Sequence, residues 1–130
     1  MPDAHLNLID GTWMPGDHLT ENRNPSDLSD LIGHYAAGTA ADVDRAVAAA
    51  RRAFESYSRT SVSERAALLE RSIAEYTRRY ADIAAAVSEE MGAPTALAQT
   101  AQAGSGLGHL KTALAVLRNY PFEEQRGSTR

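Results

Sequence analysis

Two helix-start signals, each followed by a regular apolar stripe, constrain the fold of this chain more than any other feature. Thr39 stands three residues before Asp42, and Ser61 stands three residues before Glu64. In such a capping box, the hydroxyl and the acid each bond a backbone N–H of the first helical turn. Apolar residues then recur at steps of four and three, as Val43, Val47, Ala50, Phe54 and Tyr57. We therefore expect an amphipathic helix from about residue 40.

A second, longer helix is predicted after Ser61, ending where Gly92 and Pro94 form a typical helix stop. Its apolar face comprises Leu69, Ile73, Tyr76, Tyr80, Ile83 and Val87. A helix of about 28 residues is ~42 Å long, whereas a globule of this chain length has a radius of gyration of about 14 Å. Such a helix suits a larger body better than a small one. A third helix is expected from about Thr95 to Asn119, with its stripe at Leu107, Leu110, Leu114 and Leu117.

The N-terminal third has the pattern of short strands. Asp10-Gly11 lies between apolar residues and predicts a two-residue hairpin turn. Further strands are expected over residues 18–23 and 31–37, separated by a turn at Asn24-Pro25-Ser26-Asp27. The predicted fold class is therefore α+β: short N-terminal antiparallel strands followed by three long helices.

Charge and length exclude several classes of partner. The 130 residues include 13 basic and 17 acidic ones, for a net charge of −4. Proteins that bind nucleic acid normally present a basic face, so we expect no nucleic-acid partner. Residues 1–3 do not begin a charged-then-apolar leader, and no apolar run is long enough to span a membrane. We expect one cytoplasmic domain at most, with no membrane partner.

The chain contains no cysteine, which excludes disulfides, thiolate metal sites and thiol nucleophiles. The four histidines lack the spacing of metal ligands and are interpreted as surface or packing residues: His5, His18, His34 and His109. The adjacent acids Glu89-Glu90 and Glu123-Glu124 are expected to be solvated, because neighbouring side chains diverge on a helix. Trp13 is expected to pack in the core or at the edge of the hairpin.

Gly104-Ser105-Gly106-Leu107-Gly108 has a superficial likeness to a dinucleotide-binding loop. The functional pattern is Gly-x-Gly-x-x-Gly between a strand and a helix, and here the last spacing differs and no strand precedes it. Gly104 and Gly108 lie on one helix face, where missing side chains would allow close helix contact. Packing is the preferred interpretation.

Several short motifs then follow in a fixed order. They are Leu8-Ile9-Asp10-Gly11-Thr12-Trp13, Asn24-Pro25, Ile32-Gly33, the segment Thr39 to Phe54, Ser63-Glu64-Arg65 with Leu68-Leu69, and Glu89-Glu90-Met91-Gly92-Ala93-Pro94. This series, over residues 6 to 126, resembles the N-terminal segment of the NAD(P)-dependent aldehyde dehydrogenases. The resemblance implies a fragment of their α/β cofactor-binding domain. Residues 1–38 would form the strand region, 39–120 the helical part, and 121–130 the lead into the oligomerisation strand.

The resemblance also implies what a full-length parent would do and what this chain lacks. The parent would be a homo-oligomer that oxidises an aldehyde to a carboxylic acid with NAD or NADP, through a cysteine thiolate and a glutamate-activated water. The family's Trp-Asn motif and its ribose-binding lysine are absent, and the single lysine, Lys111, matches no cofactor position. We therefore expect no catalytic residue, no cofactor-binding residue and no activity in the isolated chain. Its natural partner would be the remainder of the subunit, if that is encoded separately.

One site residue set is carried over from the resemblance. Some family members hold a monovalent cation with carbonyls just before the Asn-Pro turn and an acid two residues before the glycine. Here those positions are Asn22, Arg23 and Glu90. Oxygen ligands of this kind suit hard cations.

Two alternatives stay open at this stage. The chain could be a small helical protein-interaction module without enzymatic activity, whose three amphipathic helices form a bundle. Within the same superfamily, the parent could instead make an acyl-coenzyme A or act on a semialdehyde.

Overall fold

The Asp10-Gly11 turn forms the hairpin that the sequence predicts. In the computed structural model, which describes residues 4–128, strand β2 (Asn7–Ile9) pairs antiparallel with β3 (Thr12–Met14). Asp10 has φ 52° and Gly11 has φ 74°, so both turn residues adopt the left-handed conformation. This conformation matches the right-handed twist of the paired strands. Residues 1–3, on which the leader argument rests, and residues 129–130 lie outside the described part.

A second sheet has the strand order β1-β5-β4. Strand β4 (His18–Arg23) pairs antiparallel with β5 (Leu31–Ala37), as predicted, with a β-bulge between Asn22 and Arg23. The short strand β1 (Ala4–His5), which was not predicted, pairs parallel with β5 and adds one parallel pairing to the predicted antiparallel ones. Two residues carry no alternation pattern, and their pairing is set by where the chain enters the sheet.

Helix α1 (Ala40–Tyr57) begins at the predicted capping box. The backbone N–H of Asp42 donates to Thr39 Oγ1 at 3.2 Å, and the backbone N–H of Thr39 donates to Asp42 Oδ2 at 2.8 Å. Asp42 and Ala49 are the buried residues of this helix. Arg52 forms an ion pair of 2.7 Å with Asp10, which fastens α1 to the turn of the β2–β3 hairpin.

The second predicted helix is divided into α2 (Val62–Arg78) and α3 (Tyr80–Met91). The break falls at Arg79, with φ −99° and ψ 14°, so the expectation of one continuous helix is wrong. No glycine or proline marks this position, and the break allows α3 to pack against the segment that follows it. The predicted start at Ser61 and the stop at Gly92, with φ 65°, are confirmed.

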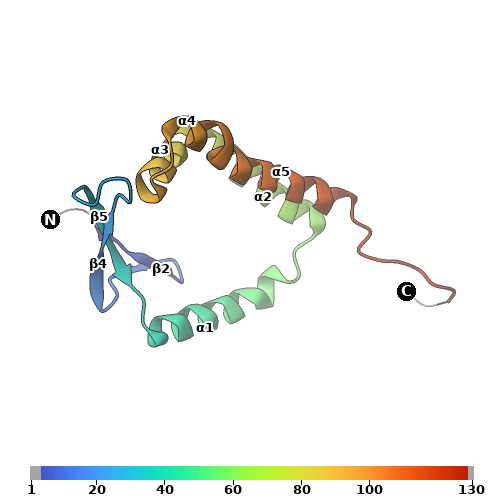
Figure 1. The fold of residues 1–130 in the computed structure, drawn as a ribbon. Helices are drawn as coiled ribbons and strands as arrows, with labels where there is room; N and C mark the ends of the chain where they lie inside the picture. Colours follow the sequence, from blue (N-terminus) through green and yellow to red (C-terminus); the bar gives the residue numbers. More distant parts are fainter. Residues whose placement is uncertain (1–3, 129–130) are drawn as a thin grey trace.

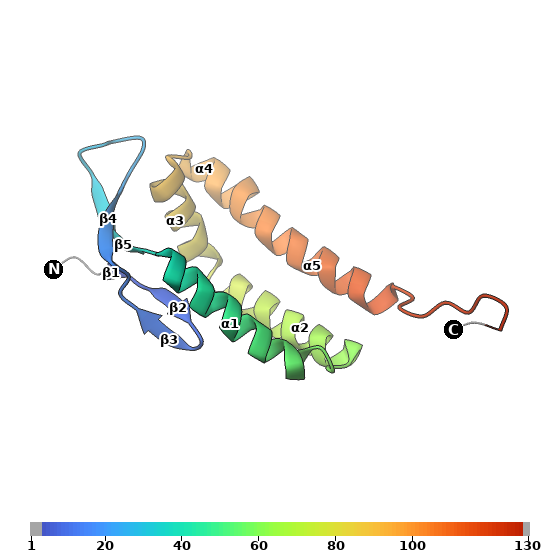
Figure 2. The same ribbon diagram turned by 90° about the horizontal axis from the view of Figure 1, so that it is seen from below.

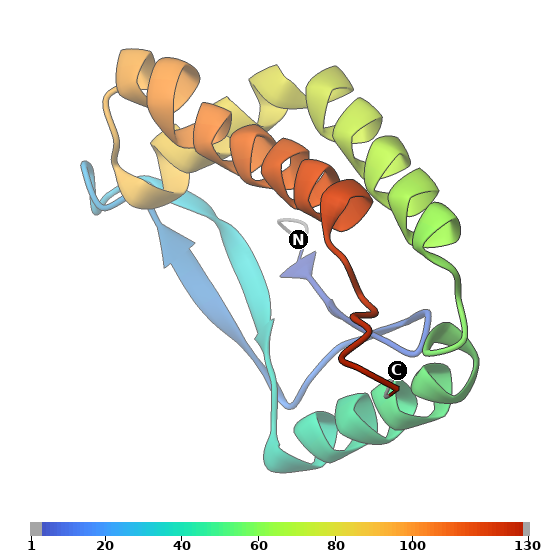
Figure 3. The same cartoon turned by 90° about the vertical axis from the view of Figure 1, so that its right-hand side faces the viewer.

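The third predicted helix has the expected limits but contains an irregular turn. It comprises α4 (Thr95–Leu97), a π-helical turn η1 (Ala98–Gln102) and α5 (Ala103–Asn119). Helix α5 packs along α2, and the two helices run side by side in Figures 1 and 3, whereas in Figure 2 helix α1 lies in front of α2. The predicted stripes of the two helices are half-buried in this contact: Leu69, Ile73 and Tyr76 on α2 face Leu107, Leu110, Leu114 and Leu117 on α5.

The elements form an open arc in which α1 lies opposite the α2–α5 pair (Figures 1 and 3). Helix α1 contacts strand β2, and the three-helix bundle of the alternative interaction module is not formed among the described residues. The buried hydrophobic residues of the described chain are all alanines: Ala36, Ala49, Ala66, Ala84, Ala98 and Ala103. No large side chain in the described part is fully buried. The arc therefore holds little core of its own. Over residues 4–128, no helix has both the length and the apolarity to cross a membrane.

Candidate functional site

Tyrosine hydroxyls from α2 and α3 donate hydrogen bonds to backbone carbonyls of η1 and of the glycine-rich start of α5. Tyr76 donates to the carbonyl of Ala103 at 2.9 Å, and Tyr80 donates to the carbonyl of Gln99 at 2.7 Å. A Cβ atom at Gly106 would lie 2.9 Å from Tyr76 Cζ, and one at Gly104 would lie 3.2 Å from the Tyr80 hydroxyl. The glycines thus make room for the two tyrosines.

The preference for packing over phosphate binding is confirmed at Gly104, which contacts Tyr80. At Gly108 the packing prediction is wrong, because a Cβ there would meet nothing within 4 Å. All three glycines lie inside α5, where the backbone N–H groups are committed to helical hydrogen bonds. Such a backbone does not form a phosphate cradle.

The two tyrosine hydroxyls bond carbonyls at the π turn η1. In a π turn the backbone bonds reach one residue further than in an α-helix, which disturbs the pairing of nearby carbonyls. The Tyr76 and Tyr80 hydroxyls bond carbonyls at its flank and within it. Sequence reasoning assigned both residues only to an apolar stripe; their spacing of four, facing a glycine-rich helix, was the available signal. Gln102 Oε1 is buried without a hydrogen-bond partner in this segment.

The proposed cation ligands lie on two segments that the structure brings together. Ser26 Oγ donates to the carbonyl of Gly92 at 3.1 Å, which fastens the turn after β4 to the end of α3. Asn22 is half-buried beside the β-bulge, and Glu90 is exposed on α3. Arg23 Nε donates to Glu21 at 2.8 Å and Arg23 Nη1 donates to the carbonyl of Leu28 at 3.0 Å. The cation site implied by the resemblance requires these two segments to be close, but the hydrogen bond between Ser26 and Gly92 was not predicted from the sequence.

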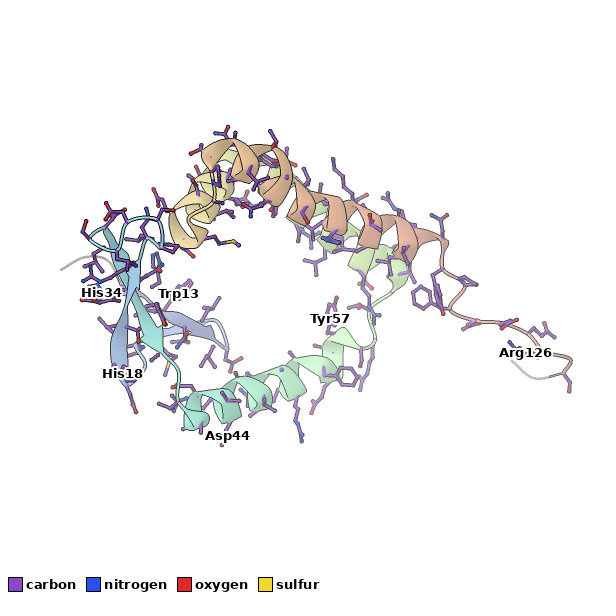
Figure 4. All side chains as sticks on the ribbon, in the orientation of Figure 1. Trp13, His18, His34, Asp44, Tyr57 and Arg126 are labelled. Carbon is purple, nitrogen blue, oxygen red and sulfur yellow. The ribbon has the colours of Figure 1, made fainter. Side chains whose placement is uncertain are left out.

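Other residues weighed in the sequence are dispersed. His5, His18 and His34 lie on β1, β4 and β5, and His109 lies on α5 (Figure 4 labels His18 and His34). Within residues 4–128, no three histidine, aspartate or glutamate side chains gather as potential metal ligands. Trp13 is 62% exposed at the edge of the hairpin. Glu89 is exposed on α3, whereas Glu124 lies beyond the helices and pairs with Arg126 at 3.1 Å.

The perturbed carboxyl groups belong to caps, turns and surface pairs. The backbone N–H and hydroxyl of Thr39 lower the pKa of Asp42, and those of Ser61 lower the pKa of Glu64. Hydrogen bonds from Ser29 lower the pKa of Asp27. Arg78 lowers the pKa of Glu75, while Glu75 raises the pKa of Arg78. These groups lie on separate elements and form no acid–base pair around a common substrate position.

Two surface hollows of similar size flank the α2–α5 contact. One of about 520 Å³ is strongly apolar and is lined by Tyr57, Arg65, Leu68, Leu69, Ala113, Val116, Leu117, Tyr120 and Phe122. In it, the Arg65 guanidinium lies 5.3 Å from the centre of the Tyr57 ring. The other, of about 550 Å³, is lined by Arg71, Ser72, Glu75, Tyr76, Arg79, Ile83 and Leu110. Neither hollow contains a residue that could serve as a thiol nucleophile.

Comparison with known proteins decides the family. A sequence model described as "Aldehyde dehydrogenase family" matches residues 13–129. This chain belongs to the aldehyde dehydrogenase family. It is 46% identical over 133 residues to 3-succinoylsemialdehyde-pyridine dehydrogenase from Pseudomonas sp., covering 100% of this chain and 28% of that protein.

Solved aldehyde dehydrogenase structures carry the same fold. The enzyme from Bartonella henselae superposes with a TM-score of 0.91 at 28% identity, over 100% of this chain and 28% of that one. A mutant of aldehyde dehydrogenase C from Pseudomonas syringae, complexed with NAD+ and octanal, gives a TM-score of 0.88 at 36% identity, over 98% and 27%. The α+β fold and the resemblance to the family's N-terminal segment are confirmed. The chain spans little more than a quarter of the length of these relatives.

Proposed function

We propose that this aldehyde dehydrogenase segment supplies the outer strands and helices of the cofactor-binding domain and oxidises no aldehyde by itself. The observation that carries the proposal is membership of the family in a chain without cysteine. As the resemblance implies, the parent oxidises an aldehyde to a carboxylic acid while NAD or NADP is reduced. Its first step needs a thiolate, because a serine hydroxyl is too weak a nucleophile without an activating base.

The small buried core favours a chain that is part of a larger subunit over a chain that folds as an independent domain. The buried hydrophobic residues of the described chain are alanines, and seventeen of its large hydrophobic side chains are exposed. A self-sufficient domain of this size covers more of its large apolar side chains. The segment is therefore a component, and its partner is the remainder of an aldehyde dehydrogenase subunit.

The same proposal places the chain in the cytoplasm, within a homo-oligomeric parent. Residues 1–38 form the strand region, residues 39–120 form the helical part, and residues 121–130 lead into the oligomerisation strand. These boundaries follow from the resemblance. The absence of a spanning helix in residues 4–128 is compatible with this placement.

The activity test combines the full chain with the part of the Pseudomonas relative that this chain does not cover. The chain alone, that remainder alone, and an equimolar mixture are assayed for NADH formation with octanal and with a semialdehyde. We expect turnover from the mixture and none from the chain. Turnover by the purified chain alone would overturn the proposal, and a cooperative, monomeric melt of the chain alone would favour the interaction module instead.

We also propose that the carbonyls of Asn22 and Arg23 and the carboxylate of Glu90 hold a monovalent cation. The Ser26–Gly92 hydrogen bond joins the two segments, and the β-bulge interrupts the regular ladder at the two carbonyls. The test uses a chimera in which this chain replaces the matching segment of the Pseudomonas relative. Potassium should raise the Tm of the chimera, and Glu90→Ala should remove that increase while Glu89→Ala leaves it. An unchanged response to potassium in Glu90→Ala would disprove the site.

A further inference from the structure

The apolar stripe of α1 is exposed along its whole length. Val43 is 61% exposed, Val47 46% and Phe54 67%, and Ala50 and Tyr57 on the same stripe are exposed as well. These residues are the ones whose spacing defines the helix as amphipathic. In the described chain, this face is contacted at its C-terminal end, where Arg65 lies over the Tyr57 ring, and all five stripe residues remain exposed.

The other two faces of α1 are accounted for. One face lies against the β2–β3 hairpin, where Ala49 is buried and Arg52 pairs with Asp10. A third face carries Asp44, Arg51 and Glu55, all exposed and suited to water. Figure 4 shows Asp44 on the outer edge of α1, away from the α2–α5 pair. The apolar stripe is therefore a separate and exposed surface on a helix whose other faces contact the hairpin or suit water.

We propose that Val43, Val47, Ala50, Phe54 and Tyr57 form the surface through which this chain docks onto the remainder of an aldehyde dehydrogenase subunit. This rests on the proposed function. The length of the relatives identifies the occupant: this chain covers 28% of them, so the rest of each relative is about two and a half times as long as this chain. A contiguous apolar stripe of this extent on an exposed helix marks a protein-binding surface.

A binding experiment with two matched variants tests the surface. The apolar variant combines Val43→Gln, Val47→Gln and Phe54→Gln, and the polar variant combines Asp44→Gln, Arg51→Gln and Glu55→Gln. All six side chains are exposed, so these changes remove little packing within the chain. Each form is titrated against the remainder of the Pseudomonas relative. We expect the apolar variant to bind at least about tenfold more weakly and the polar variant to bind like the unchanged chain.

Thermal unfolding of the chimera tests the same surface within one polypeptide, without assembly from two pieces. In the chimera, the apolar variant should lower Tm by about 5 °C or more, and the polar variant should leave it nearly unchanged. Equal binding or equal Tm for the two variants would overturn the docking surface. So would a dimer of the chain alone that the apolar variant dissociates, since the occupant would then be a second copy. Failure of the proposed function has a different signature, because the unchanged chain would then bind the remainder without restoring NADH formation.

Discussion

The hydroxyl of Tyr76 lies 2.9 Å from the carbonyl oxygen of Ala103 and joins α2 to the first residue of α5. The bond is part-buried, and it closes over Gly106, where any side chain would collide with the tyrosine ring. One hydrogen bond and one glycine therefore set how closely the two longest packed helices approach. Both can be altered separately.

Removing the hydroxyl should destabilise the fold without changing its shape. In the chimera, Tyr76→Phe removes the part-buried hydrogen bond from the hydroxyl to the Ala103 carbonyl, which we expect to cost about 1 kcal/mol. Tyr120→Phe is the control, since Tyr120 is 59% exposed. Urea unfolding measures both variants, and equal midpoints for the two would show that the bond contributes nothing.

Two glycines on α5 should respond to alanine in opposite directions. Gly106→Ala places a Cβ 2.9 Å from Tyr76 Cζ, so the helices must separate and Tm should fall. Gly108→Ala meets nothing within 4 Å, and we expect a gain of about 0.5–1 kcal/mol from the helix propensity of alanine. Thermal melts of the chimera distinguish the two. A loss of stability in Gly108→Ala would contradict this account of the segment.

The turn between β4 and β5 makes Gly92 harder to replace than another left-handed glycine. Gly92 has φ 65° and Gly127 has φ 61°, so alanine is strained at both, by about 1 kcal/mol. Only at Gly92 would the new Cβ also meet Ser26 and Pro25, the latter at 3.1 Å from Cγ. We expect Gly92→Ala to lower the unfolding free energy clearly more than Gly127→Ala. Similar losses at both positions would show that the contact with the turn is unimportant.

The two capping boxes predict a stability loss in acid. Hydrogen bonds from Thr39 and Ser61 lower the pKa of Asp42 and Glu64 below their ordinary values of 3.8 and 4.5. Their contribution is therefore fully present above those ordinary values and is lost as the pH falls through the lower pKa of the folded state. Thermal melts of the chimera between neutral pH and strong acid measure the effect. Asp42→Asn combined with Glu64→Gln should flatten the dependence below about pH 4, and an unchanged acid profile would refute the assignment.

Local chemistry made much of the fold predictable. The capping boxes at Thr39 and Ser61, the Asp10-Gly11 turn and the stop at Gly92 are each satisfied within a few residues, so the sequence pattern contains them completely. The break at Arg79 and the π turn after Ala98 depend on how α3 packs against the following helix. No local pattern marks either one, and propensity yields to such packing.

The candidate site was less predictable than the fold. The hydrogen bond between Ser26 and Gly92 joins residues far apart in the chain, and nothing in either segment alone specifies it. The roles of Tyr76 and Tyr80 were hidden because an amphipathic stripe explains their position equally well. The α1 stripe was read correctly as apolar, but its exposure in the described chain could not be predicted from the pattern.

In the described chain every buried hydrophobic residue is an alanine, and this has a consequence for the stability of the polypeptide in a cell. Alanine gives little free energy on burial, so the chain on its own opens readily and offers its backbone to proteases. Its steady-state amount should then track the supply of whatever shields it, falling when that supply falls even at constant synthesis. The degradation rate of the chain in a cell, rather than any catalytic activity, would then be the first property to show that a binding partner is present.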